Sequence, residues 1–77
     1  MSELDRIRWQ CRRGMLELDL TLAKFLDHDY AALTASEKAA FRSLLDRSDE
    51  ELWALISGRK EPEAAELAPV VRLLREG

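Results

Sequence analysis

The 77-residue chain has few of the residues that interrupt helices or form covalent cross-links. It contains three glycines and two prolines, and its single cysteine, Cys11, excludes an intramolecular disulfide and is typical of a reducing compartment. No apolar run approaches the roughly 18 residues of a membrane span, and the N-terminus lacks the pattern of a signal peptide. We therefore expect a cytoplasmic protein with no membrane insertion.

The composition that remains is typical of helices. Hydrophobic residues make up 47% of the chain and charged residues 35%, which indicates a folded and well-solvated protein. Abundant Leu, Ala, Glu and Arg with few helix breakers argues against a β-sandwich or a barrel. A chain of this length holds one hydrophobic core and should have a net stability of roughly 4–11 kcal/mol, which makes an enclosed cleft for a large cofactor improbable. We expect a single helical domain over residues 1–77.

Charge is distributed unevenly along the chain, whose formal net charge is −3. Residues 1–13 carry four arginines against two acidic residues, a balance of +2, so residues 14–77 carry −5. Because the total is negative, sequence-independent binding to DNA or RNA has little electrostatic driving force. We expect no nucleic-acid partner.

The first segment predicts a short amphipathic helix over residues 3–12. Leu4, Ile7 and Cys11 recur at helical spacing and would form its apolar face. Gly14 follows two arginines and is expected to end this helix, because glycine accepts the left-handed conformation.

The next segment has two interpretations. Residues 16–22 alternate apolar and polar side chains, the pattern of a half-buried strand. No other segment offers a partner strand, and the apolar run continues without a turn signal, so we favour a helix over residues 15–28. On this helix Glu17, Thr21 and Lys24 form one polar stripe and most of the rest is apolar, which predicts a position in the middle of a bundle.

Capping signals mark two later helices. Thr34 with Glu37, and Ser48 with Glu51, have the spacing of the capping box. We expect these helices to end near Asp46 and at Gly58.

The last helix contains Pro69, so it either begins near Ala68 or kinks there. The expected inward-facing residues of the last three helices are Phe41, Leu44, Leu45, Leu52, Leu55, Ile56, Leu67, Val70, Val71 and Leu74, with Trp53 at the margin. The sequence predicts an all-α fold, a compact single-domain bundle of about five short helices.

Groups for self-contained catalysis are scarce in this sequence. It has no glycine-rich phosphate loop, no Cys/His ligand cluster, and no serine or cysteine with a base at motif spacing. His28 is interpreted as a solvated helix-end residue, and Cys11 as a buried structural cysteine. We expect no enzyme, no metal site and no tightly bound cofactor.

Asp19 is the exception among the acidic residues. It projects on the same side as Leu22 and Leu26, where an unpaired carboxylate is costly. We predict a partner for it, either Arg12 or a helix N-terminus.

The densest group of candidate functional residues lies between the first two helices. Trp, Arg and Met are enriched at binding hot spots. Taken one at a time, the residues of this group are explained by helix capping or by reversal of the chain. A tryptophan that lies between arginines, outside the apolar face of the helix, favours a binding surface instead. The candidate partner-binding residues are Arg8, Trp9, Arg12, Arg13, Gly14, Met15 and Glu17.

At this cluster the chain resembles the FAD assembly factors of succinate dehydrogenase. Their R-G-x-x-E motif is matched by Arg13-Gly14-Met15-Leu16-Glu17, and bacterial members are similar to the longer run Trp9-x-Cys11-Arg12-Arg13-Gly14-Met15-x-Glu17-Leu18-Asp19. The resemblance covers nearly the whole chain and continues through Phe25, His28, Tyr30, Leu33, Glu37, Phe41, Leu44-Leu45, Asp49, Leu52 and Val71-Arg72-Leu73.

This resemblance implies a five-helix bundle that acts as an assembly chaperone. Its partner would be the flavoprotein subunit of succinate dehydrogenase, and that of the related fumarate reductase, while FAD becomes covalently attached to a histidine of the partner. The motif roles carry over to Arg13, Gly14 and Glu17: Gly14 would let the backbones approach, and the two charged residues would supply charge-assisted contacts. Pro69 departs from the family and bears only on the start of the last helix.

Two other functions stay open from the sequence. One is a small antitoxin-like or regulatory module whose basic face meets nucleic acid or a toxin. The other is an enzyme or direct flavin carrier, in which Trp9 or Trp53 stacks on the flavin. Titration with free FAD tests the second, and a salt-dependent shift assay tests the nucleic-acid version of the first.

Overall fold

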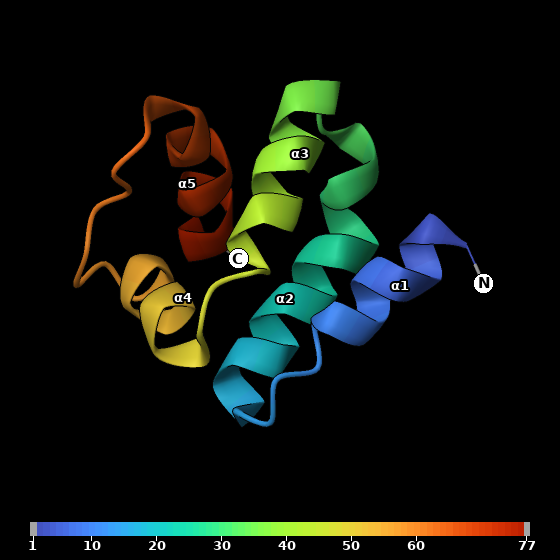
Figure 1. Ribbon diagram of the computed structural model, residues 1–77, viewed down its shortest axis with the longest axis horizontal. Coiled ribbons are helices and arrows are strands. Elements are labelled where there is room, and N and C mark those ends of the chain that lie inside the picture. Colours follow the sequence, from blue (N-terminus) through green and yellow to red (C-terminus); the bar gives the residue numbers. More distant parts are fainter. Residues whose placement is uncertain (1, 77) are drawn as a thin grey trace.

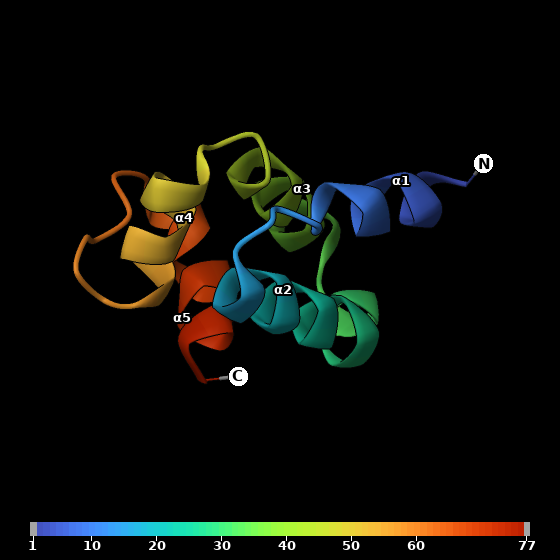
Figure 2. The same cartoon turned by 90° about the horizontal axis from the view of Figure 1, so that it is seen from below.

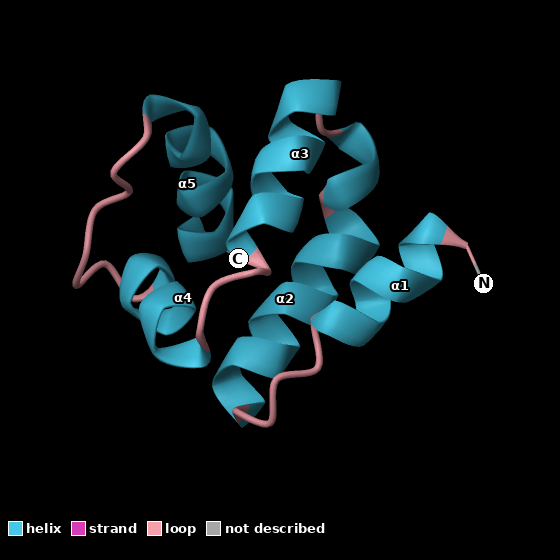
Figure 3. Ribbon diagram, in the orientation of Figure 1, coloured by secondary structure: helices cyan, strands magenta, loops and turns pink. Residues whose placement is uncertain are grey.

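The computed structural model describes residues 2–76, which form five α-helices and two short 3-10 helices (Figure 1). Only helices and connecting loops occur in this part of the chain (Figure 3). The predicted all-α fold is confirmed, and residues 16–22 are helical. The α-helices are α1 (Glu3–Gln10), α2 (Leu16–His28), α3 (Ala35–Leu44), α4 (Asp49–Ile56) and α5 (Ala68–Glu76), with 3-10 turns η1 at Tyr30–Ala32 and η2 at Ala65–Leu67.

Local sequence signals set the starts of these helices. The Thr34 hydroxyl accepts a hydrogen bond from the Glu37 backbone N–H (3.2 Å), and the Glu37 carboxylate accepts one from the Thr34 N–H (2.9 Å). This is the predicted capping box of α3. At α4 the Ser48 hydroxyl accepts from the Glu51 N–H (3.2 Å). Pro69 is the second residue of α5, where its missing N–H costs no helical bond, so the first of the two alternatives, a start near Ala68, is the one observed.

Three helices end two residues earlier than predicted. α1 ends at Gln10, and Gly14 instead forms a separate left-handed turn three residues beyond its cap. α3 and α4 end at Leu44 and Ile56 because the residues that follow tighten into turns. The Asp46 N–H donates to the Ser43 carbonyl and the Gly58 N–H to the Leu55 carbonyl, both three residues back.

The core is one cluster with aromatic rings near its centre. The ring centroids of Phe25 and Phe41 are 4.8 Å apart, and those of Tyr30 and Phe41 are 5.6 Å apart. Every inward-facing residue predicted for α3, α4 and α5 is buried, and Trp53 packs at the margin as expected.

Burial of the first two helices was predicted less well. Leu4 is 46% exposed, so the apolar face of α1 consists of Ile7 and Cys11. α2 is not surrounded by other helices, because Leu16 and Leu20 are 70% and 62% exposed. The prediction of a helix in the middle of the bundle is therefore wrong for one side of α2.

The arrangement of the helices explains that exposure. Figure 2 shows α2 and α5 along one side of the molecule and α1, α3 and α4 along the other. α1 crosses the α2 side of the bundle, at the end farthest from α4 and α5 (Figure 1). The connection between α1 and α2 carries four of the candidate residues, of which Arg12 and Gly14 are exposed and Arg13 and Met15 are half-buried.

Candidate functional site

The centre of the candidate site is the turn at Gly14. Its φ of +86° lies in the left-handed region, which explains why glycine occupies this position. Apart from its two chain neighbours, no described residue has an atom within 4 Å of a Cβ added there. The turn therefore faces open space, and a side chain at this position would project away from the protein.

Asp19 holds this turn from α2. Its Oδ1 accepts a hydrogen bond from the backbone N–H of Arg13 at 2.6 Å, and its Oδ2 accepts one from the N–H of Gly14 at 3.3 Å. The prediction that Asp19 needs a partner is confirmed. Of the two partners predicted, Arg12 is wrong, and the N–H groups that satisfy the carboxylate come just before α2.

The Arg13 side chain is directed into the protein and is only 13% exposed. Its Nε donates to Asp49 Oδ1 (2.8 Å), and its Nη1 to the carbonyl oxygens of Leu45 (2.6 Å) and Gln10 (3.2 Å). Its Nη2 donates to the carbonyl oxygen of Arg47. The motif arginine thus ties the α1–α2 connection to the α3–α4 connection, more than 30 residues away in sequence.

The other motif residues are oriented differently. Glu17 and Arg12 are exposed, and neither charged group has a hydrogen-bond or ion-pair partner among residues 2–76. Trp9 is 70% exposed. Arg8 pairs with Asp27 of α2 at 2.9 Å. These four side chains lie at the surface, where the binding interpretation requires them.

A groove of about 530 Å³ runs between the end of α1 and the first half of α2. It brings three of the predicted residues together, Arg8, Arg12 and Gly14, and adds Leu20 from α2. Trp9, Arg13, Met15 and Glu17 are not among the residues that line it, and Met15 is half-buried against the core instead.

Sequence reasoning missed the two exposed leucines of α2 and the carboxylate of Asp49. Leu16 and Leu20 belong to the alternating pattern of residues 16–22, which predicted a helix in the middle of the bundle. Asp49 was identified only as one of the residues shared with the family, and no neighbouring residue in the sequence indicates a contact with Arg13.

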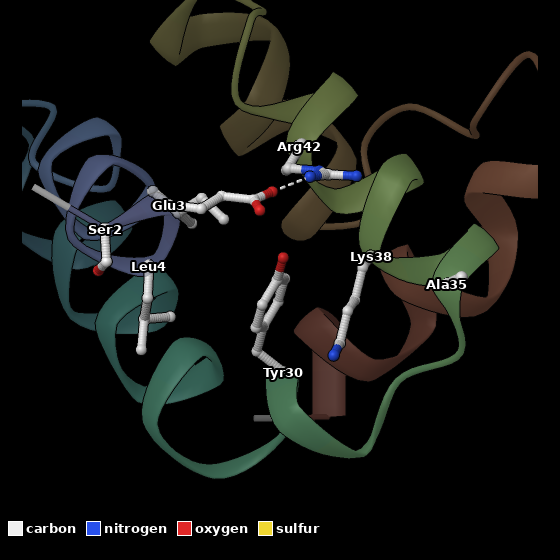
Figure 4. A pocket seen from close by; sticks show the side chains of 8 residues that line it. Ser2, Glu3, Leu4, Tyr30, Ala35, Lys38 and Arg42 are labelled. Atoms are coloured by element: carbon white, nitrogen blue, oxygen red, sulfur yellow. Dashed lines mark hydrogen bonds and ion pairs between the residues drawn. The ribbon is translucent and has the colours of Figure 1, made fainter.

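A second hollow, of about 440 Å³, lies between the start of α1 and α3 (Figure 4). Glu3 of α1 forms an ion pair with Arg42 of α3 across it, and the Tyr30 ring stands beside them. The Lys38 ammonium lies 5.4 Å from the centroid of that ring. The Glu3–Arg42 ion pair joins the first turn of α1 to α3, and the Lys38–Tyr30 contact joins α3 to η1.

Cys11 lies beneath the groove and is 3% exposed. Burial raises the pKa of its thiol to about 11, although the nearby guanidinium groups of Arg8 and Arg13 act in the opposite direction. The thiol is therefore protonated at neutral pH, which agrees with the interpretation of a structural cysteine rather than a nucleophile.

The raised pKa of Cys11 predicts a specific pH dependence of stability. In the unfolded chain the thiol loses its proton at about pH 9, whereas in the folded chain it holds the proton to about pH 11. The free energy of unfolding should therefore fall as pH rises between these values. Urea titrations of wild type and Cys11→Ala from pH 8 to pH 11 measure this difference. Equal pH slopes for the two proteins would contradict the assignment.

No group of three or more His, Cys, Asp or Glu side chains in the described chain is placed to hold a metal ion. None of the helices within residues 2–76 is long and apolar enough to cross a bilayer.

These residues define a small all-α protein whose candidate site is an exposed turn, fixed by hydrogen bonds, beside a basic and apolar groove. The chain belongs to the family described as "Flavinator of succinate dehydrogenase", which matches residues 5–77.

Several relatives carry the name FAD assembly factor SdhE. The protein of Legionella pneumophila (strain Lens) is 45% identical over 73 residues, which cover 95% of this chain and 91% of the relative. That of Pseudomonas aeruginosa is 42% identical, with 95% and 87% covered. That of Coxiella burnetii is 41% identical, with 92% and 87% covered.

Proposed function

We propose that this chain binds the flavoprotein subunit of succinate dehydrogenase and promotes covalent attachment of FAD to that subunit. The observation that carries the proposal is the family match over residues 5–77. The motif from Arg13 to Glu17 lies within this match, on an exposed turn. We extend the proposal to the flavoprotein of the related fumarate reductase, and we place the encounter in the cytoplasm.

In this proposal the chain is not an enzyme and holds no FAD tightly by itself. The histidine that forms the bond to FAD belongs to the partner, and the buried Cys11 thiol is poorly suited to act as a nucleophile. The chain contributes by stabilising the arrangement of the flavoprotein in which FAD and that histidine are close. Holding reacting groups in a productive geometry accelerates a reaction without a new chemical group.

Surface chemistry supports docking through the α1–α2 face. The carboxylate of Glu17 and the guanidinium of Arg12 have no partner within residues 2–76, so both are available for charge-assisted hydrogen bonds. Gly14 leaves room for another backbone, and Trp9 offers a large exposed ring. Arg8 and Met15 would widen the contact from the groove and from the edge of the core.

The exposed leucines supply the apolar part of this surface. Leu16 and Leu20 lie one helical turn apart on α2, and Leu20 lines the same groove as Gly14. Burying such side chains against a partner contributes about 1.5–3 kcal/mol each. A docked face of roughly 800 Å² per partner is feasible for a protein of this size.

Leu20→Asp is expected to weaken binding to the flavoprotein subunit about 10- to 100-fold, because it removes apolar contact and places a charge in the interface. Leu4→Asp is the matched control, since Leu4 is also exposed but lines the hollow between α1 and α3. Isothermal titration of both variants against the purified subunit measures the difference. Equal affinities for the two variants would exclude Leu20 from the docking surface.

Two titrations of the wild-type chain separate the proposed function from its alternatives. We expect a stable complex with the flavoprotein subunit of succinate dehydrogenase, and no saturable quenching of tryptophan fluorescence by free FAD. Saturable quenching by FAD without a partner would support the flavin-carrier interpretation. Failure to bind the subunit would overturn the proposal and favour the antitoxin-like or regulatory module.

A further inference from the structure

The contacts of Arg13 give the motif arginine a different task from that of Glu17. Within residues 2–76, its guanidinium donates to one carboxylate and three carbonyl oxygens of the same chain, and the side chain is 13% exposed. A guanidinium has five N–H donors, so most of its capacity is used within the protein. Little of it is left for a second protein.

The same turn is held from the opposite side by Asp19, which accepts the backbone N–H groups of Arg13 and Gly14. The Arg13 backbone is thus fixed by α2, and its side chain by Asp49 at the start of α4. Charge-assisted hydrogen bonds of this kind are stronger than neutral ones. Together they fix the position of Gly14, although nothing packs on the outer side of that residue.

A further link extends this arrangement toward the C-terminal half of the chain. The Arg47 carbonyl oxygen accepts from Arg13, and the Arg47 side chain pairs with Glu63 and, at 3.7 Å, with Glu51. Three connections of the bundle, α1–α2, α3–α4 and α4–η2, are therefore joined at one place.

We propose that Arg13 is a positioning residue: it promotes docking by holding the Gly14 turn, together with Asp19 and Asp49, and does not itself touch the flavoprotein subunit. This inference rests on the proposed function, which supplies the identity of the partner, the flavoprotein subunit. The ordering of the turn belongs to the free chain and can be tested without any partner.

The test compares Arg13→Met with Arg12→Met, two neighbouring substitutions that each remove one positive charge. Three quantities are measured at a temperature where circular dichroism shows both variants folded. They are amide hydrogen exchange at residues 13 and 14 in the free chain, whose N–H groups donate to Asp19, affinity for the purified flavoprotein subunit, and the dependence of that affinity on salt. Arg13→Lys, which keeps the charge and part of the donor set, is a second variant in case Arg13→Met does not fold.

We expect Arg13→Met to speed exchange at residues 13 and 14 at least tenfold, because the turn then opens locally and their bonds to Asp19 break. The folded variant should bind the subunit about tenfold more weakly, with the salt dependence of wild type. Arg12→Met should leave exchange unchanged and reduce the salt dependence, as the loss of an interface charge does. Arg13→Lys should fall between wild type and Arg13→Met in both exchange and affinity.

Two results would overturn this inference. Unchanged exchange with a reduced salt dependence in Arg13→Met would show that Arg13 contacts the partner directly. Faster exchange with unchanged affinity would show that Arg13 only stabilises the fold. If the wild-type chain does not bind the subunit at all, the proposed function fails and the positioning role with it, while the exchange data still report whether Arg13 orders the turn.

Discussion

Gly14→Arg is expected to abolish docking to the flavoprotein subunit and, with it, covalent attachment of FAD. The substitution has two separable effects. A residue other than glycine at φ +86° costs about 1–2 kcal/mol, because its Cβ crowds the backbone. The long side chain also projects into the open space that the partner would occupy, since within residues 2–76 no atom beyond the two chain neighbours lies within 4 Å of the added Cβ.

Gly58→Arg is the matched control for this substitution. Gly58 has a φ of +87° and the same open surroundings, but it follows α4 and does not line the groove beside Gly14. Both variants should lose similar stability in urea titrations, and only Gly14→Arg should lose affinity for the subunit by biolayer interferometry. Equal affinity in the two variants would show that strain, and not the position of the turn, governs the effect.

Phe41→Ala is expected to have the largest effect on the fold itself. Phe41 is fully buried and contacts the rings of Phe25 and Tyr30, so its truncation leaves a cavity between α2, η1 and α3. Such truncations cost about 3–5 kcal/mol. Because a domain of this length has only about 4–11 kcal/mol in total, the variant should be largely unfolded well below the melting temperature of wild type.

Urea denaturation followed by circular dichroism measures this loss. Leu16→Ala is the reference, since Leu16 is 70% exposed and its truncation should change the free energy of unfolding by less than about 0.5 kcal/mol. A cost of less than about 1 kcal/mol for Phe41→Ala would contradict the central position of this ring in the core.

Features that depend on neighbours in sequence were predictable. The capping box of Thr34 and Glu37 acts within one helical turn, and the buried face of α5 follows from its apolar spacing. The identity of the motif was also visible, because Arg13, Gly14 and Glu17 are adjacent in the chain. The left-handed conformation of Gly14 was predicted correctly, although α1 ends at Gln10 and not at this glycine.

Features that depend on distant residues were not predictable. The apolar pattern of α2 contains both its buried side and the exposed Leu16 and Leu20, because a pattern does not show where a helix lacks a neighbour. The direction of the Arg13 side chain is set by carbonyl oxygens and a carboxylate 32 to 36 residues away. The candidate set was therefore found from the sequence, but its division into outward-facing and inward-facing members required the fold.

The most direct test of the central claim is covalent flavin on the flavoprotein subunit in a bacterial strain that lacks its own FAD assembly factor. Wild type, Gly14→Arg, Gly58→Arg and Glu17→Ala are expressed in this strain, and fluorescence of the denatured subunit is read in the gel. We predict a fluorescent band with wild type and Gly58→Arg, and a weak or absent band with the two motif variants. No band with a folded, expressed wild-type chain would contradict the proposed function, and equal bands with all four proteins would contradict the role of the motif.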